Sequence, residues 1–208
     1  MQKRCGQQQH ISGGIEHLQH RTCAQQGQHG SQPAHPGARG QRGAGHPVVL
    51  KVDSPDIPHK TEAGAVRLGL TSLQGQAEMA GATGYLVEEM VTGAVAEILL
   101  GLRRDPVYGI SLTVGMGGVT AEVLADTVTL ILPATAAEIL DAMLGLRLWP
   151  LLDGYRGRPR ADMAAVAEIA VRLGALMLAD DSLEEIEINP ILVRQSGAVA
   201  VDALIRKA

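Results

Sequence analysis

The composition of this 208-residue chain changes abruptly near residue 47, and only the part after that point is patterned like a folded domain. Residues 1–46 contain six of the seven histidines, ten glutamines and both cysteines, with no apolar period of 2 or 3.6. Such a segment buries too little apolar surface to offset the entropy of an ordered chain. We therefore expect residues 1–46 to be disordered or foreign to the fold, as a wrong start site or shifted reading frame would make them, and residues 47–208 to form the domain.

Charge and apolar patterning narrow the class of protein. The first 46 residues carry five basic and one acidic side chain, and the remainder carries 13 basic and 21 acidic ones. An acidic folded part argues against nucleic acid as a partner. The chain has neither a stretch apolar enough to span a membrane nor the apolar core of a signal peptide, so we expect no membrane partner and a cytoplasmic location. Cys5 and Cys23 form no CxxC motif, and two free thiols are favoured over a zinc site.

Residues 47–208 alternate predicted strands and helices, which indicates a mixed α+β or α/β fold. Thr135 opens a capping box, Thr-Ala-Ala-Glu, for a helix that ends near Leu146. Apolar residues three and four apart predict an amphipathic helix over Ala161–Leu178. We expect a short helix over Val119–Leu124 and a loop over Leu151–Arg160. Apolar or branched runs predict strands at Val48–Val52, Tyr85–Met90, Glu97–Arg103, Ile110–Val114 and Val128–Ile131.

The C-terminal hairpin allows a geometric prediction. Two predicted strands, Glu185–Val193 and Ala198–Ile205, are joined by a four-residue turn. In the antiparallel pair that this turn closes, Asn189 lies opposite Asp202, and Glu187 shares their face of the sheet. Carboxylate and amide oxygens suit Mg²⁺, which takes one or two protein ligands and fills its remaining positions with water and substrate phosphate. The alternative is a solvated polar face on an edge hairpin.

Three other features are candidates for handling phosphate. Lys51 ends an apolar run, and His59 is the one histidine outside residues 1–46. The run Gly115–Gly118, with sequence GMGG, would bring backbone N–H groups close to an anion. Each also has a plainer interpretation: a snorkelling surface lysine, a structural or exposed histidine, and a tight turn. P-loop, nucleophile-elbow and zincin motifs are absent from the sequence.

Six segments, taken together, resemble the ATP-grasp module of the NDP-forming acyl-CoA synthetases. This family includes the ADP-forming acetate–CoA ligases and is related to the succinyl-CoA synthetase β subunit. The segments occur in the family's order and span most of the chain after residue 46. They are VVLKVDSPDIPHKTEAG, GYLVEEMVTGAVAE, GLRRDPVYG, VGMGGVTAEVLAD, PLLDGYRGRP, and EIEINPILV with GAVAVDALI.

The resemblance implies an ATP-grasp fold, in which ATP is held between two α+β lobes. It implies that Lys51 contacts the nucleotide phosphates and that Glu97 binds the ribose hydroxyls. The strand end formed by Glu88, Glu89 and Met90 matches the segment whose backbone recognises adenine. ATP or ADP is therefore the expected nucleotide.

The resemblance also assigns the metal and the phosphoryl carrier. Asn189 and Asp202 match the family's Mg²⁺ ligands, and Glu187 is a nearby acidic candidate. His59 matches a histidine that carries phosphate between the nucleotide and a partner domain. The implied reaction converts a small carboxylic acid, CoA and ATP into acyl-CoA, ADP and phosphate, with CoA and the acid bound by a CoA-binding, α-like subunit or domain.

Several departures from the family pattern shape these expectations. The segment that normally precedes the first strand is replaced by residues 1–46, and the stretch between Leu70 and Gly84 is short, so we expect the N-terminal lobe to be incomplete. Glu88 stands where the family has glutamine, and Gly64-Ala65 replaces a glycine pair. The alternative functions are a degenerate or regulatory ATP-grasp domain of a protein-acetyltransferase relative, or an inactive fragment.

Overall fold

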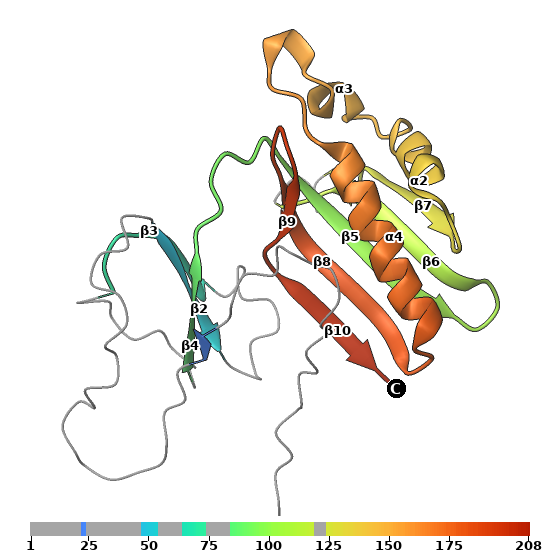
Figure 1. Ribbon diagram of the computed structural model, residues 1–208, viewed down its shortest axis with the longest axis horizontal. Coiled ribbons are helices and arrows are strands. Elements are labelled where there is room, and N and C mark those ends of the chain that lie inside the picture. The colour runs from blue at the N-terminus through green and yellow to red at the C-terminus, as the bar shows by residue number, and fades with distance from the viewer. Residues whose placement is uncertain (1–21, 24–46, 54–63, 74–83, 119–123) are drawn as a thin grey trace, which may run out of the picture. The chain divides into compact units, whose positions relative to one another are not determined.

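The computed structural model describes residues 22–23, 47–53, 64–73, 84–118 and 124–208. It divides into two compact units, the first ending at Met90 and the second beginning at Val91, and Figure 1 shows the elements of each. Of the segment predicted to lie outside the fold, Thr22–Cys23 forms the short strand β1. The remaining residues of 1–46 lie outside the described residues, so the domain boundary at residue 47 stays a prediction.

The first unit contains a four-stranded antiparallel sheet in the order β1-β4-β2-β3. The predicted strands at 48–52 and 85–90 are confirmed as β2 (Val48–Asp53) and β4 (Gly84–Glu89). The strand β3 (Val66–Leu70) was not predicted. Its sequence, VRLGL, places an arginine and a glycine within five residues, which hides the alternation that marks a strand.

The second unit is a six-stranded antiparallel sheet with helices on one face (Figure 1). The strand order is β10-β8-β5-β6-β7, and the short β9 also pairs with β8. Helix α4 packs against β5, β6 and β8, while α2 packs against β7 and α4. The strands are β5 (Ala96–Asp105), β6 (Gly109–Met116), β7 (Thr127–Ile131), β8 (Leu183–Val193), β9 (Ala198–Ala200) and β10 (Ala203–Lys207).

Alternation along the strands separates a core face from a polar face. On β5, Ile98, Leu100 and Leu102 are buried in the core beneath the helices. The residues between them point to the opposite face, because successive side chains of a strand alternate. That polar face holds a shallow hollow of about 260 Å³, lined by Leu99, Gly101, Leu102, Arg103, Ser111, Thr113, Glu185 and Glu187.

Both longer helices begin at a side-chain cap, and the capping box of the first was predicted from the sequence. Helix α2 (Ala136–Met143) begins with the predicted capping box: the Thr135 N–H donates to Glu138 Oε2 at 2.8 Å, and the Glu138 N–H donates to Thr135 Oγ1 at 3.3 Å. Helix α4 (Met163–Ala179) is capped by Asp162, which accepts from the Ala165 N–H at 3.1 Å. A side-chain oxygen at the N-cap satisfies an otherwise unpaired N–H, so its sequence signal is direct.

One predicted loop is wrong in part, and one predicted helix is largely outside the described residues. The predicted Leu151–Arg160 loop is wrong in part, because α3 (Trp149–Leu152) and the 3₁₀ helix η1 (Tyr155–Gly157) occupy much of it. Elements of three or four residues are too short to show an amphipathic period. Of the predicted helix at Val119–Leu124, all but the last residue lies outside the described residues.

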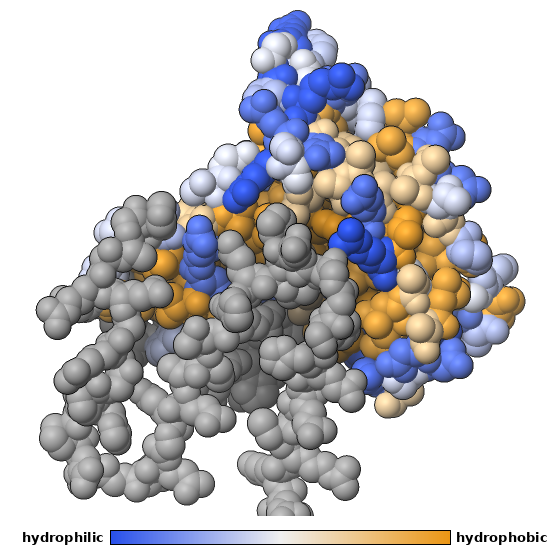
Figure 2. Space-filling view, in the orientation of Figure 1, coloured by the Kyte–Doolittle hydropathy of each residue, from blue (hydrophilic) through white to orange (hydrophobic). Residues whose placement is uncertain are grey.

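The outer surface of the helical layer mixes apolar and polar side chains (Figure 2). Leu144, after α2, and Leu178, on α4, are each about half exposed, at 51% and 50%. Within the described part of the chain, no helix is long and apolar enough to cross a membrane.

The predicted hairpin register is confirmed on both sides of a break. Val193 pairs with Ala198 at the turn, and Ile188 pairs with Ala203 further along. The single strand predicted over 198–205 is nevertheless divided into β9 and β10. On the other side of β8, Asn189 and Pro190 together oppose the single residue Leu99 of β5, which is the count of a β-bulge.

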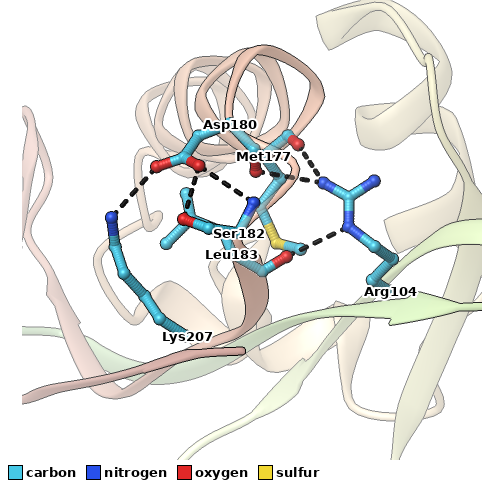
Figure 3. Close-up of polar contacts among 6 residues, drawn as sticks. All are labelled: Arg104, Met177, Asp180, Ser182, Leu183 and Lys207. Atoms are coloured by element: carbon cyan, nitrogen blue, oxygen red, sulfur yellow. Dashed lines mark hydrogen bonds and ion pairs between the residues drawn. The ribbon is translucent and has the colours of Figure 1, made fainter.

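Arg104 of β5 ties the end of α4 to the start of β8 (Figure 3). Its Nε donates to the Leu183 carbonyl at 3.1 Å, and its Nη2 donates to the carbonyls of Met177 and, at 3.2 Å, Asp180. The Met177 and Asp180 carbonyls lie at the C-terminal end of the helix and in the turn after it, where backbone acceptors lack helical partners, and Leu183 is the first residue of β8. A guanidinium has several donors in one plane, so one side chain satisfies three of them.

The Asp180 carboxylate fastens the same turn to β10. It accepts from the Ser182 hydroxyl at 2.6 Å and the Ser182 N–H at 3.0 Å, and Lys207 Nζ lies 3.1 Å away (Figure 3). The hydrogen bonds from Ser182 and Lys207 lower the pKa of Asp180 from its ordinary 3.8 to about 2. Because the folded state holds this group ionised, its contribution to stability is present above 3.8 and is lost as the pH falls through about 2.

We predict that Asp180→Asn lowers the melting temperature, and that the difference from the wild type shrinks as the pH falls from 3.8 towards 2. Thermal unfolding followed by circular dichroism across this range measures the difference. Asp141→Asn, at an exposed site on α2, is the matched control and should show a smaller difference. An Asp180→Asn difference that stays constant with pH would contradict this account.

Candidate functional site

In the first unit, Lys51 forms a close ion pair that the sequence analysis did not foresee. Lys51 lies on β2 and is 7% exposed, and its Nζ is 2.7 Å from Glu88 Oε2 on β4. The register pairs Val49 with Glu88, so Lys51, two residues further along, lies diagonally across from Glu88 on the same face. Burial and the ion pair do not fit a snorkelling surface lysine. Lys51 and Glu88 are far apart in sequence and lie on neighbouring strands, so their pairing can be predicted only when the register of those strands is known.

Two other candidates before residue 91, Glu89 and Met90, lie at and just after the end of β4. Glu89 pairs with Val48 at the end of β4, and its side chain is exposed. The Met90 N–H donates to the Pro47 carbonyl at 3.0 Å, extending the β2–β4 pairing by one step. His59 lies outside the described residues.

In the second unit, the glycine run at the end of β6 meets the start of β5. Gly115 and Met116 continue the strand, so the run is not simply a tight turn. The Gly117 N–H donates to the Glu97 carbonyl at 2.8 Å. A Cβ at Gly117 would lie 2.8 Å from the backbone carbonyl carbon of Ile98, a separation that real side chains do not reach. Glycine is needed here because two backbones approach closely.

The bulge of β8 meets the same run from the other side. The Gly118 N–H points at Asn189 Oδ1 at 3.4 Å. Asp202 is half-buried, and its Oδ1 accepts from the Ala203 N–H at 3.2 Å. Because the pairing on both sides of the break keeps one register, Asn189 and Asp202 occupy opposite positions, as predicted. Glu187 lies two residues before Asn189 and lines the hollow on the polar face.

The donor set at this position suits a hard cation. Asn189, Asp202 and Glu187 offer amide and carboxylate oxygens only, which are the ligands of Mg²⁺ rather than of zinc. In the parts of the chain that the structure describes, no three His, Cys, Asp or Glu side chains cluster tightly enough to hold a metal by themselves. A small set of amide and carboxylate oxygens fits a cation that takes few protein ligands and completes its coordination with water and phosphate.

Comparison with known proteins identifies the fold. The ATP-grasp domain family matches residues 37–206 of this chain. The chain belongs to this family. The ATP-grasp fold and the family resemblance predicted from the sequence are thus confirmed.

The most similar relatives include acyl-CoA-forming ligases. The chain is 33% identical over 172 residues to the β subunit of acetate–CoA ligase (ADP-forming) I from Pyrococcus furiosus, covering 76% of this chain and 74% of that subunit. It is 36% identical over 171 residues to acetate–CoA ligase (ADP-forming) I from Archaeoglobus fulgidus, covering 76% of this chain and 25% of the relative. The chain thus spans about a quarter of the length of this longer relative.

A solved structure is similar to this chain in fold. It is the dinucleotide-forming acetyl-coenzyme A synthetase 1 of Candidatus Korarchaeum cryptofilum, in complex with coenzyme A and Mg-AMPPCP, with its phosphohistidine segment pointing towards the nucleotide-binding site. The TM-score is 0.66 at 26% identity, over 78% of this chain and 76% of that one.

We predict that Lys51 and Glu88 are energetically coupled in the first unit. Lys51→Met leaves the Glu88 carboxylate without this cation. The double variant Lys51→Met, Glu88→Gln should therefore lose less free energy of unfolding than the sum of the losses in the two single variants. The coupling should be about 1–2 kcal/mol, because the pair is largely buried. Hydrogen exchange of the β2 and β4 amides at increasing urea concentration measures it in the full chain.

The matched control is the pair Arg206 and Glu185, whose side chains are 57% and 26% exposed at a separation of 3.0 Å. The corresponding single and double variants of Arg206 and Glu185 form the same double-mutant cycle. Their coupling energy should be about 0.5 kcal/mol or less, as is usual for solvent-exposed pairs. Equal coupling in the two cycles would show that burial adds nothing to the Lys51 pair.

Proposed function

We propose that this chain is the nucleotide-binding, phosphoryl-transfer component of an ADP-forming acyl-CoA synthetase. The enzyme would convert a carboxylic acid, CoA and ATP into acyl-CoA, ADP and phosphate through a phosphohistidine. The observation that carries the proposal is the pairing of the C-terminal hairpin on both sides of residues 189 and 202, which supports Asn189 and Asp202 as a pair of oxygen ligands near the glycine run of an ATP-grasp fold. The match to ADP-forming acetate–CoA ligases supports the same reaction class.

The proposal gives nucleotide roles to individual residues of the chain. Lys51 neutralises phosphate charge, and Glu97 accepts hydrogen bonds from the ribose hydroxyls. The backbone of Glu88, Glu89 and Met90 recognises adenine. Since the Met90 N–H donates to Pro47, the adenine contacts fall to the other backbone groups of this segment.

Asn189 and Asp202 hold Mg²⁺ in this proposal, with Glu187 as a nearby acidic group that accepts hydrogen bonds from metal-bound water. The cation supplies charge neutralisation for the transferring phosphoryl group. These residues would contribute a pair of oxygens, because the pairing of β8 with β9 and with β10 on either side of them keeps a single register.

His59 is the proposed phosphoryl carrier. Its neutral imidazole nitrogen attacks the γ-phosphorus of ATP, and the bond to the departing ADP oxygen breaks. The phosphoryl group then moves from the imidazole to a carboxylate oxygen of the acid, forming an acyl phosphate. The thiolate of CoA attacks the acyl carbon and releases phosphate, which balances the overall reaction.

The acid and CoA would be bound by a partner. Relatives of about this chain's length are named as β subunits, and longer relatives contain the matched region within one chain. We propose that a CoA-binding, α-like subunit or domain supplies those sites and exchanges the phosphoryl group with His59.

We predict that His59→Gln abolishes transfer of labelled γ-phosphate from Mg-ATP to the full chain, assayed with a CoA-binding subunit from a related enzyme present. The label should be acid-labile and base-stable, as expected of a phosphoramidate. His46→Gln, the nearest other histidine in the sequence, is the control and should keep the label. Nucleotide binding by the wild type without any labelling would instead favour a regulatory ATP-grasp domain, and absence of both would favour an inactive one.

We predict that Asp202→Asn weakens ADP binding in the presence of Mg²⁺ by roughly 10- to 150-fold, the equivalent of one lost charge-assisted contact. Without Mg²⁺ the variant should bind ADP at least as well as the wild type, because a carboxylate that repels phosphate is gone. Isothermal titration calorimetry with and without Mg²⁺ measures both. Glu184→Gln, at an exposed position of β8, is the control. Equal losses in both conditions would exclude Asp202 as a metal ligand.

A further inference from the structure

Gly118 lies at a point where no side chain fits, and a carboxylate occupies the space that a side chain would take. Its φ is +64°, in the left-handed region that favours glycine. A Cβ built there would lie 2.0 Å from Glu97 Oε2 and 3.1 Å from Glu97 Cδ. The Glu97 carboxylate therefore lies directly over the Gly118 Cα.

The backbone of Gly118 is held on two sides. The preceding residue, Gly117, is hydrogen-bonded to the Glu97 carbonyl at 2.8 Å and packs against the backbone of Ile98. On the other side the Gly118 N–H faces Asn189 Oδ1 at 3.4 Å. A peptide N–H only donates, so the atom of the Asn189 amide that faces it must be the oxygen.

These contacts determine what moves when Gly118 is changed. The backbone is held between β5 and β8, whereas Glu97 Oε2 is the free end of a flexible side chain. A methyl group at residue 118 would therefore displace the carboxylate and leave the strands in place.

We propose that Gly118 is the positioning residue for Glu97. By having no side chain, Gly118 leaves the space that the Glu97 carboxylate occupies, so that the group assigned to ribose and a group assigned to Mg²⁺ both lie next to this one residue. This deepens the proposed function and rests on it, because Glu97 gains its role there. In this proposal Gly118 acts through Glu97 and takes no part in the phosphoryl transfer itself.

The test compares Gly118→Ala, Glu97→Ala and the double variant by calorimetric titration with ADP and 2′-deoxy-ADP in the presence of Mg²⁺. The wild type should prefer ADP, and both single variants should lose that preference and bind ADP roughly tenfold more weakly. The double variant should bind like Glu97→Ala alone, because a displaced carboxylate and a deleted one have the same effect. Single losses that multiply in the double variant would overturn the proposal.

The matched control is Gly109→Ala at the first residue of β6. Gly109 has a φ of +85° and nothing within 4 Å of its built Cβ, so an alanine there adds comparable backbone strain without a steric neighbour. Its ADP affinity and its preference over 2′-deoxy-ADP should equal those of the wild type. A loss of preference in Gly109→Ala equal to that in Gly118→Ala would overturn the proposal.

A second measurement does not depend on nucleotide. The side-chain carboxyl ¹³C resonance of Glu97 should shift in Gly118→Ala and stay in place in Gly109→Ala. An unmoved resonance in Gly118→Ala would overturn the positioning role. If the resonance shifts but the wild-type chain binds no ADP, the proposed function fails while the positioning of Glu97 by Gly118 stands.

Discussion

The antiparallel register of β8 with the strands that follow it determines where the candidate ligands of the second unit lie. A slip of one residue would move every side chain of the hairpin to the other face of the sheet. The register is set by the short turn after Val193 and is held by core residues such as Ile186 and Ile188. The bulge at Asn189 then changes the alternation, so that Ile191 and Val193 point into the core three and five residues after Ile188. Asn189, one residue after the buried Ile188, points to the polar face, and its side-chain amide reaches the glycine run at the end of β6.

The sequence allowed prediction of features that depend on neighbouring residues. The hairpin register followed from the turn length, and the capping box followed from the spacing of Thr135 and Glu138. Features created by packing between distant segments were missed. The ion pair between Lys51 and Glu88 needs the β2–β4 register, which no short turn fixes. The division of the last strand into β9 and β10 lies opposite the Asn189–Pro190 bulge, where β8 has one residue more than its neighbour β5.

The same contrast explains the glycine run. Its composition suggested either an anion-binding turn or a plain tight turn, both of which are local explanations. In the structure the need for glycine at residues 117 and 118 comes from β5, about twenty residues earlier in the sequence. Close packing against the backbone of Ile98 excludes a side chain at one position, and the Glu97 carboxylate fills the space at the next. A requirement of this kind can be located only after the strands are paired.

Electrostatics make the cation central to the proposed chemistry. Residues after 46 carry 21 acidic against 13 basic side chains. Three of these acidic residues, Glu97, Glu187 and Asp202, belong to the candidate site of the second unit, where the nucleotide is proposed to bind. The lysine assigned to phosphate already has Glu88 at 2.7 Å, so much of its charge is balanced within the first unit. A polyphosphate approaching these carboxylates is repelled unless positive charge is added. Mg²⁺ held by Asn189 and Asp202 would supply that charge where the repulsion is greatest, so in this chain the metal would strengthen nucleotide binding as well as support phosphoryl transfer.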